Sequence, residues 1–107
     1  MAVDRNNLPE GLLQDIKVHL DITWNDDATD QKVRGIIADG MIYLNKKLGE
    51  EADYTADGQP RTLLKDYARY ARDSALDVFE NNYMSQILSM QNERAVEAYV
   101  AQAEQTE

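Results

Sequence analysis

Cysteine is absent from the 107 residues of this chain, and proline occurs only twice. Without cysteine there is no disulfide framework, no thiolate metal site and no cysteine nucleophile. Apolar runs long enough for a signal peptide or a membrane span are lacking too, so no membrane contact is expected. The polar residues 1–8 are expected to form a disordered N-terminal lead, and the remaining length suffices for one modest hydrophobic core.

Basic residues are scarce relative to acidic ones. Twenty Asp and Glu residues stand against eleven Lys and Arg residues, which gives a formal net charge of -9. Such a balance offers no net neutralisation of phosphates, so sequence-independent binding to nucleic acid is not expected. The same charge favours a soluble monomer and opposes self-association until enough apolar surface is buried between copies.

Apolar residues recur at intervals of three and four along most of the chain, which predicts an all-α fold. We expect a small bundle of three to four helices with a long C-terminal helix. The first helix is predicted at 9–20 and the second from about Ala28 to Leu48. An acidic turn before Ala28 supplies the expected N-cap, and Gly49 the expected left-handed C-cap. The acidic stretch at 50–59 is expected to be a surface loop.

The third helix is predicted to begin at Pro60, because proline suits the first helical turn. Its apolar stripe continues through Val78 and Phe79, with alanines in the middle where helices can pack closely. Gly40 lies on the apolar face of the second helix. Either another helix approaches closely there, or the glycine is a tolerated defect that costs about 1 kcal/mol relative to alanine.

A break is predicted at Asn81–Asn82, after which the apolar stripe becomes weaker and narrower. The chain would then divide into a helical domain at 9–82 and a C-terminal helical arm and tail at 83–107. The arm is expected to be helical without necessarily packing on the domain. Such a segment frays in the monomer and becomes ordered when it packs against a neighbour.

The sequence contains no recognisable catalytic constellation. His19 is the only histidine, with Asp15 one turn earlier and no serine nearby, so an ordinary surface or partly buried histidine is the preferred interpretation. The acidic residues around Asp26 lack the EF-hand order of ligands and are interpreted as a helix cap. We therefore predict that the protein is not an enzyme and has no metal site and no cofactor.

The third helix carries the one basic stripe of the sequence. Its basic residues recur at intervals of four, four and three: Arg61, Lys65, Arg69 and Arg72. Acidic residues interleave with them, so the preferred interpretation is a solvated face laced with ion pairs, such as Arg69 with Asp73. If the stripe binds a partner, an acidic protein fits better than DNA.

Aromatic and apolar residues supply the other candidate contacts. Trp24 is expected to cover the core beside a helix end, although tryptophan also anchors interfaces. Tyr67 on the third helix is expected to be part of the core. On the C-terminal helix, the residues predicted to join the basic stripe in partner binding are Tyr83, Ile87, Met90, Arg94 and Tyr99.

The order of these features resembles the small head-tail connector (adaptor) proteins of long-tailed bacteriophages, over roughly residues 10 to 90. A short helix ends in a turn with an acidic cluster, a longer helix follows, and an acidic loop leads to a third helix that begins with proline. The residues that carry the resemblance are Leu20-Asp21-Ile22-Thr23-Trp24, Ile36-Ile37, Gly40, Tyr43-Leu44, Gly49, Leu63-Leu64, Tyr67, Ala71 and Phe79.

This resemblance implies a structural protein that takes part in virion assembly and DNA packaging. In that family an adaptor docks on the portal protein, forms a closed ring of roughly a dozen copies by head-to-tail contacts, and extends the DNA channel toward the next head-completion or tail protein. DNA would pass through without specific binding, as a negatively charged wall favours. The expected location is the virion at the head-tail junction, and the host cytoplasm before assembly. The C-terminal arm would grip the portal or a neighbouring copy.

Two other classes stay open. A small helical regulatory adaptor or anti-repressor would bind one host protein through the acidic surface or the basic stripe, without affinity for a portal. A nucleic-acid-binding protein is supported only by the basic stripe, and an assay at low salt would detect it most readily. An enzyme ranks last.

Overall fold

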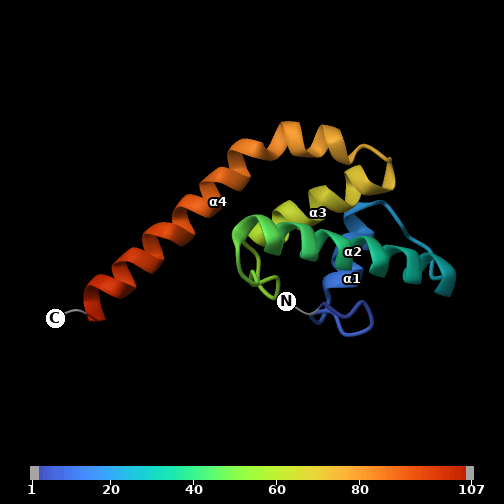
Figure 1. Cartoon of the computed structure of the whole chain (residues 1–107). Coiled ribbons are helices and arrows are strands. Elements are labelled where there is room, and N and C mark those ends of the chain that lie inside the picture. Colours follow the sequence, from blue (N-terminus) through green and yellow to red (C-terminus); the bar gives the residue numbers. More distant parts are fainter. Residues whose placement is uncertain (1–2, 106–107) are drawn as a thin grey trace.

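The described residues form four α-helices (Figure 1). The computed structural model describes residues 3–105, with side chains up to residue 103, and contains no strand among them. The helices are α1 (Leu12–His19), α2 (Asp27–Leu48), α3 (Gln59–Arg72) and α4 (Leu76–Gln105). The predicted all-α class is confirmed, and so is the long C-terminal helix, because α4 has 30 residues. Within this described part of the chain, no helix combines the length and hydropathy needed to cross a membrane.

Both ends of α2 follow the sequence signals. Asp26 is the N-cap, and its carboxylate accepts a hydrogen bond from the Thr29 backbone N–H at 3.2 Å. Gly49 ends the helix in the left-handed conformation, with φ of 86°. Glycine lacks the Cβ that makes this conformation unfavourable for other residues. The acidic N-cap and the glycine C-cap are therefore confirmed.

The N-terminal segment departs from the prediction. The first helix starts at Leu12, later than expected, because Gly11 adopts a left-handed conformation with φ of 78°. Residues 3–8, which belong to the lead expected to be disordered, contain a turn. The Arg5 carbonyl oxygen accepts a hydrogen bond from Arg34 Nη1 at 3.1 Å, so this segment contacts α2. The first two residues of the lead lie outside the described part of the chain.

The chain reverses direction at residues 73–75. Ser74 adopts a left-handed conformation there, with φ of 56°. The Ala75 backbone N–H donates to the Tyr70 carbonyl oxygen at 2.8 Å, which closes the turn. Residues 60–104 therefore form two helices joined by a short turn, and α4 returns along α3 (Figure 1).

The break predicted at Asn81–Asn82 is wrong, because both asparagines lie inside α4. Asparagine costs at most about 0.7 kcal/mol relative to alanine in a helix interior. Phe79 is only 1% exposed, and burying an aromatic side chain stabilises by about 1.5 to 3 kcal/mol. We call α1, α2, α3 and the loops that join them the body. Packing of α4 on the body thus outweighs the weak helix propensity of the two asparagines. The boundary predicted between 82 and 83 therefore falls within a continuous helix. The last two residues of the predicted tail lie outside the described part.

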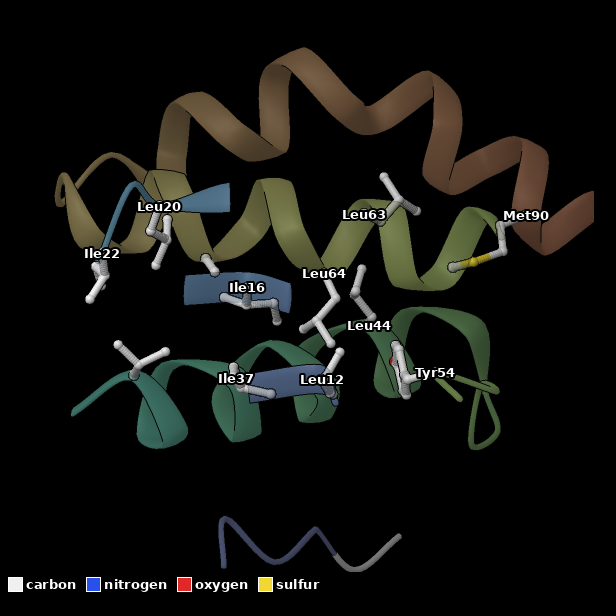
Figure 2. Packing of buried hydrophobic residues seen from close by; sticks show 12 residues of the cluster. Leu12, Ile16, Leu20, Ile22, Ile37, Leu44, Tyr54, Leu63, Leu64 and Met90 are labelled. Atoms are coloured by element: carbon white, nitrogen blue, oxygen red, sulfur yellow. The ribbon is translucent and has the colours of Figure 1, made fainter. Parts of the chain in front are cut away.

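α1 packs against both α2 and α3, and its apolar side chains belong to the core that these helices share (Figure 2). Leu12 and Ile16 are fully buried, and Ile37 of α2 and Leu64 of α3 belong to the same cluster. Met90 of α4 also joins this cluster. All four helices therefore contribute to one core, as expected for a chain of this length.

The acidic loop between α2 and α3 is anchored in this core, although its composition predicts a surface loop. Tyr54 is 2% exposed, and its hydroxyl donates to Asn45 Oδ1 at 2.7 Å. The Ala52 backbone N–H donates to the same oxygen at 3.0 Å. Burial raises the pKa of Tyr54 well above its usual value of 10.0, so the hydroxyl remains a donor. The loop is thereby fixed against the end of α2.

Gly40 marks the closest approach of α2 and α3. A Cβ atom at this position would lie 2.7 Å from Leu64 Cδ1 and 2.7 Å from Tyr67 Cδ1. Such distances are far below ordinary van der Waals contact, so a side chain here requires its neighbours to move. Of the two interpretations open from the sequence, close approach of another helix is the one that holds.

An aromatic cluster fastens the first part of α4 to α2 and α3. Phe79 lies at its centre, with ring centroids 4.7 Å from Tyr83 and 5.6 Å from Tyr67. Tyr67 is 6% exposed, so its predicted place in the core is confirmed. Val78, expected on the apolar stripe, is instead 43% exposed, because it lies on α4 and points away from this cluster. The other rings of the cluster belong to Tyr43 and Tyr70.

Candidate interaction surfaces

Along α4, packing contacts with the other helices and the acidic loop continue to Arg94. Ile87 and Met90 are buried, and Gln91 Nε2 donates to the Lys47 carbonyl oxygen at 2.6 Å. The Arg94 guanidinium forms an ion pair with Glu50. Every side chain from 95 to 103 is exposed, and Figure 1 shows this end of α4 extending past the other helices. At 1.5 Å per residue α4 is about 45 Å long, which accounts for most of the 56 Å long axis of the molecule.

Exposed apolar side chains gather on the side of α4 that faces away from the body. Val96 follows the buried Ile87 by about two and a half helical turns, which places it on the opposite side of the helix. It is 61% exposed, and Tyr99 is 73% exposed. We call this surface the arm face, and its members are Leu88, Val96, Tyr99 and Val100. Glu93 and Glu97 lie at its edge, where they also border the depression between α4 and the acidic loop. Leu88 and Val96 line a shallow depression on this side of α4, together with Ser85 and Ser89.

The residues predicted for partner binding on the C-terminal helix fall on two different sides of α4. Ile87 and Met90 are core residues, Tyr83 is half-buried in the aromatic cluster, and Arg94 is paired with the body. Tyr99 alone lies on the arm face. The sequence analysis missed Leu88, Val96 and Val100, which share a helical face with Tyr99 and could have been found from that spacing.

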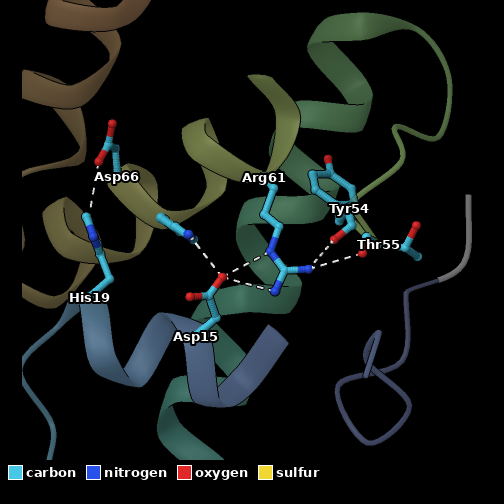
Figure 3. Close-up of polar contacts among 7 residues, drawn as sticks. Asp15, His19, Tyr54, Thr55, Arg61 and Asp66 are labelled. Atoms are coloured by element: carbon cyan, nitrogen blue, oxygen red, sulfur yellow. Dashed lines mark hydrogen bonds and ion pairs between the residues drawn. The ribbon is translucent and has the colours of Figure 1, made fainter. Parts of the chain in front are cut away.

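The basic stripe of α3 faces α1 and contacts it (Figure 3). Arg61 Nε and Nη2 donate to Asp15 Oδ2 at 3.1 and 3.0 Å, and Lys65 Nζ lies 3.0 Å from the same oxygen. Arg61 Nη1 also donates to the carbonyl oxygens of Tyr54 and Thr55, at 3.0 and 3.4 Å. One carboxylate thus joins α1 to α3, and Arg61 adds the acidic loop to this network.

The charge of Asp15 depends on these contacts. The hydrogen bond from Lys65 is the largest influence and lowers the pKa of Asp15 below its usual value of 3.8. Partial burial opposes this shift, and the hydrogen bond from Arg61 adds to it. The carboxylate is therefore ionised throughout the neutral range, and the network holds wherever Asp15 is charged.

The remaining two basic residues of the stripe contact the end of α1. Arg69 Nη2 donates to the His19 carbonyl oxygen at 3.0 Å and lies 3.8 Å from Asp21 Oδ2. Arg72 Nη1 donates to the Leu20 carbonyl oxygen. These groups satisfy backbone oxygens at a helix end, where cations are favourable. All four basic side chains are thus engaged within the monomer, and their role in binding an acidic partner stays a prediction.

His19 and Asp30 of the acidic cluster form contacts with neighbouring helices. His19 Nε2 lies 3.3 Å from Asp66 Oδ1, on α3, rather than beside Asp15 on its own helix (Figure 3). Asp30 pairs with the buried Lys17 at 2.8 Å, and Lys17 Nζ also donates to Asn25 Oδ1 at 3.2 Å. Among the side chains that the structure describes, no group of three or more His, Asp or Glu residues could hold a metal ion.

Trp24 does not close over the core as expected. It is 48% exposed, and its indole Nε1 donates to Thr29 Oγ1 at 3.4 Å. The ring forms one wall of a hollow of about 180 Å³. Core residues Leu20, Ile22 and Val33 line the hollow, and the basic residues Lys32 and Arg72 lie beside it. We call this surface the Trp24 hollow.

Comparison with protein-family models, with curated proteins and with solved structures found no match for this chain. The arm face and the Trp24 hollow are therefore the observations on which a function is proposed.

Proposed function

We propose that the protein is a structural adaptor of a phage head-tail junction. It would dock on the portal ring, assemble with further copies of itself into a ring, and extend the DNA channel toward the tail. The observation that carries the proposal is the two-part character of α4. One part fastens a small body, and the other presents apolar side chains beyond it (Figure 1).

Assembly is the mechanism in this proposal. Val96, Tyr99 and Val100 remain exposed in the monomer, and contact with a neighbour or with the portal would remove them from water. Each Å² of apolar surface buried in this way stabilises the contact by about 25 cal/mol. Because the arm is already helical in the structure, docking orders few further backbone torsions, so more of this free energy is available for binding.

Charge supports passage of DNA without adhesion. The net charge is -9, and the four basic side chains of α3 are engaged with α1 and with backbone oxygens. A ring of such subunits would present an acidic wall to the phosphate backbone, and counterion release would contribute little affinity. The virion at the head-tail junction is therefore the proposed location.

The proposal is tested by deleting this gene from the phage or prophage that encodes it and examining the released particles by electron microscopy. We expect DNA-filled or emptied heads beside complete, unattached tails. Complementation with a chain that ends after Arg94 should fail to restore joined particles, while the full chain restores them.

Ending the chain after Arg94 avoids misfolding as an explanation for a loss of function. Removing 84–107 would also remove the core residues Ile87 and Met90, so a loss of function there would reflect misfolding. A chain that ends after Arg94 keeps both. Intact, infectious tailed particles from the deletion would overturn the proposal and leave the regulatory adaptor as the function to pursue.

A further inference from the structure

The molecule has two unpartnered apolar surfaces of different shape. The arm face is the open side of a helix that extends past the other helices, with Val96, Tyr99 and Val100 exposed. The Trp24 hollow is concave and exposes an indole beside core residues. Its volume of about 180 Å³ corresponds to about six water-sized volumes, which suits one inserted side chain. Tryptophan and arginine, both present at this hollow, are enriched among the residues that dominate binding energy.

These two surfaces lie at opposite ends of the molecule. The hollow is formed by the segment that leads into α2 and by the first turns of α2. Figure 1 shows the start of α2 at one end of the molecule and the C-terminal end of α4 at the other. The long axis measures 56 Å, so the two surfaces cannot meet within one chain. They can meet only between copies.

The charged residues that line the two surfaces have opposite signs. Glu93 and Glu97 lie beside the apolar side chains of the arm face. Lys32 and Arg72 lie beside the hollow, in a chain whose net charge is -9. Two arm faces brought together would bring glutamates of both copies near each other, which is unfavourable. An arm seated in the hollow of a neighbour would pair unlike charges instead.

We propose that the arm face of one copy docks in the Trp24 hollow of the next, so that copies join head to tail. This inference rests on the proposed function, which requires each copy to contact two neighbours, and it names the surfaces that do so. A heterologous contact of this kind repeats in one direction and closes into a ring when the rotation between copies permits. Val96 and Val100 would supply the apolar contact, with Glu97 near Lys32.

The absence of cysteine allows a direct test by disulfide mapping. The variant Thr23→Cys places a thiol next to Trp24 at an exposed position, and Val100→Cys places one on the arm face. The two full-length variants are mixed under mild oxidation over a range of concentrations. We expect the mixed disulfide to form at least about fivefold more than in a control that pairs Val100→Cys with Ile42→Cys, an exposed apolar position elsewhere on α2. A chain with both Thr23→Cys and Val100→Cys should give a ladder of oligomers.

Charge variants test the same contact. Lys32→Glu or Glu97→Lys alone should lower the mixed-disulfide yield roughly two- to fivefold, and the two together, one on each partner, should restore it. Both positions are exposed, so folding is not at risk. Yields equal to the Ile42→Cys control, or a dominant disulfide between two Val100→Cys chains, would overturn the inference.

Failure of the inference and failure of the proposed function give different results. If the disulfide test fails while gene deletion still releases unjoined heads and tails, the connector role stands and the copies meet through other surfaces. If the ladder forms while deletion leaves infectious particles, the protein assembles head to tail in another role.

Discussion

The two parts of α4 differ in their neighbours more than in their helical character. Residues 76–94 place Phe79, Ile87 and Met90 in the core, and residues 95–103 are exposed throughout. Both parts contain apolar residues, but the first buries some of them against the other helices, whereas the second leaves all of its described apolar side chains exposed. The position of an apolar residue around the helix, relative to the body, therefore decides whether it stabilises the monomer or remains available for a partner.

Shortening the chain at two points should separate the roles of the two parts of α4. Ending it after Tyr83 removes Ile87 and Met90 from the core, which should lower the free energy of unfolding by about 4 to 10 kcal/mol. Ending it after Arg94 removes only side chains that are exposed as far as the structure describes them, and should cost less than about 1 kcal/mol. Urea denaturation followed by circular dichroism measures both. Equal losses would show that the two parts do not differ.

The second prediction concerns two adjacent residues in the first part of α4. Phe79→Ala should lower the free energy of unfolding by about 3 to 5 kcal/mol, because the ring is 1% exposed and packs on Tyr67 and Tyr83. Val78→Ala is the matched control and should change it by no more than about 0.5 kcal/mol, because Val78 is exposed. Thermal unfolding of both variants provides the measurement, and a large effect of Val78→Ala would contradict the assigned helix face.

The third prediction tests the close contact between α2 and α3 on which the first part of α4 packs. Gly40→Ala should destabilise the protein by about 1 to 3 kcal/mol, because the new Cβ meets Leu64 and Tyr67 at 2.7 Å. Tyr67 in turn contacts Phe79, so hydrogen exchange should rise in the first part of α4 and stay unchanged in the second.

Gly35→Ala is the control for this substitution. Its Cβ meets only the flexible guanidinium of Arg5, at 3.3 Å and beyond. It should be neutral or stabilise by up to about 1 kcal/mol, since alanine favours the helix. A destabilisation equal to that of Gly40→Ala would argue against close approach as the cause.

The smallest effect is predicted for a substitution on α1, which does not alter α4. Asp15→Asn should lower the free energy of unfolding by about 1 kcal/mol near neutral pH, because Arg61 and Lys65 lose a charged partner that is itself partly exposed. The pKa of Asp15 is lowered on folding, so its contribution is complete above the usual value of 3.8. It is lost as the pH falls through the lower, folded-state pKa.

Unfolding measured at neutral pH and again well below pH 4 checks this prediction. The difference between the wild type and Asp15→Asn should shrink at the lower pH, because protonation removes the same charge. Asp53→Asn serves as the control, since that carboxylate accepts its hydrogen bonds from Thr55 within one loop and joins no helices. A difference between wild type and Asp15→Asn that grew on acidification would contradict the assigned role.

Most of the helices were predictable because their signals are local. A carboxylate at Asp26 caps α2, glycine at Gly49 ends it, and proline at Pro60 starts α3 in its first turn, whatever surrounds them. Apolar spacing likewise determined the all-α class. Acidic composition and the absence of cysteine restrict the chemistry of the chain without reference to any fold.

Tertiary packing decided the features that local signals do not contain. The break fell at Ser74 rather than at Asn81–Asn82, because burial of Phe79 on α3 outweighs the propensity of two asparagines. The same packing turned Ile87 inward and left Val96 exposed on the other side of α4. Periodicity shows that a helix has an apolar side, but only the contacts between helices determine which apolar residues the monomer buries and which it leaves for a partner.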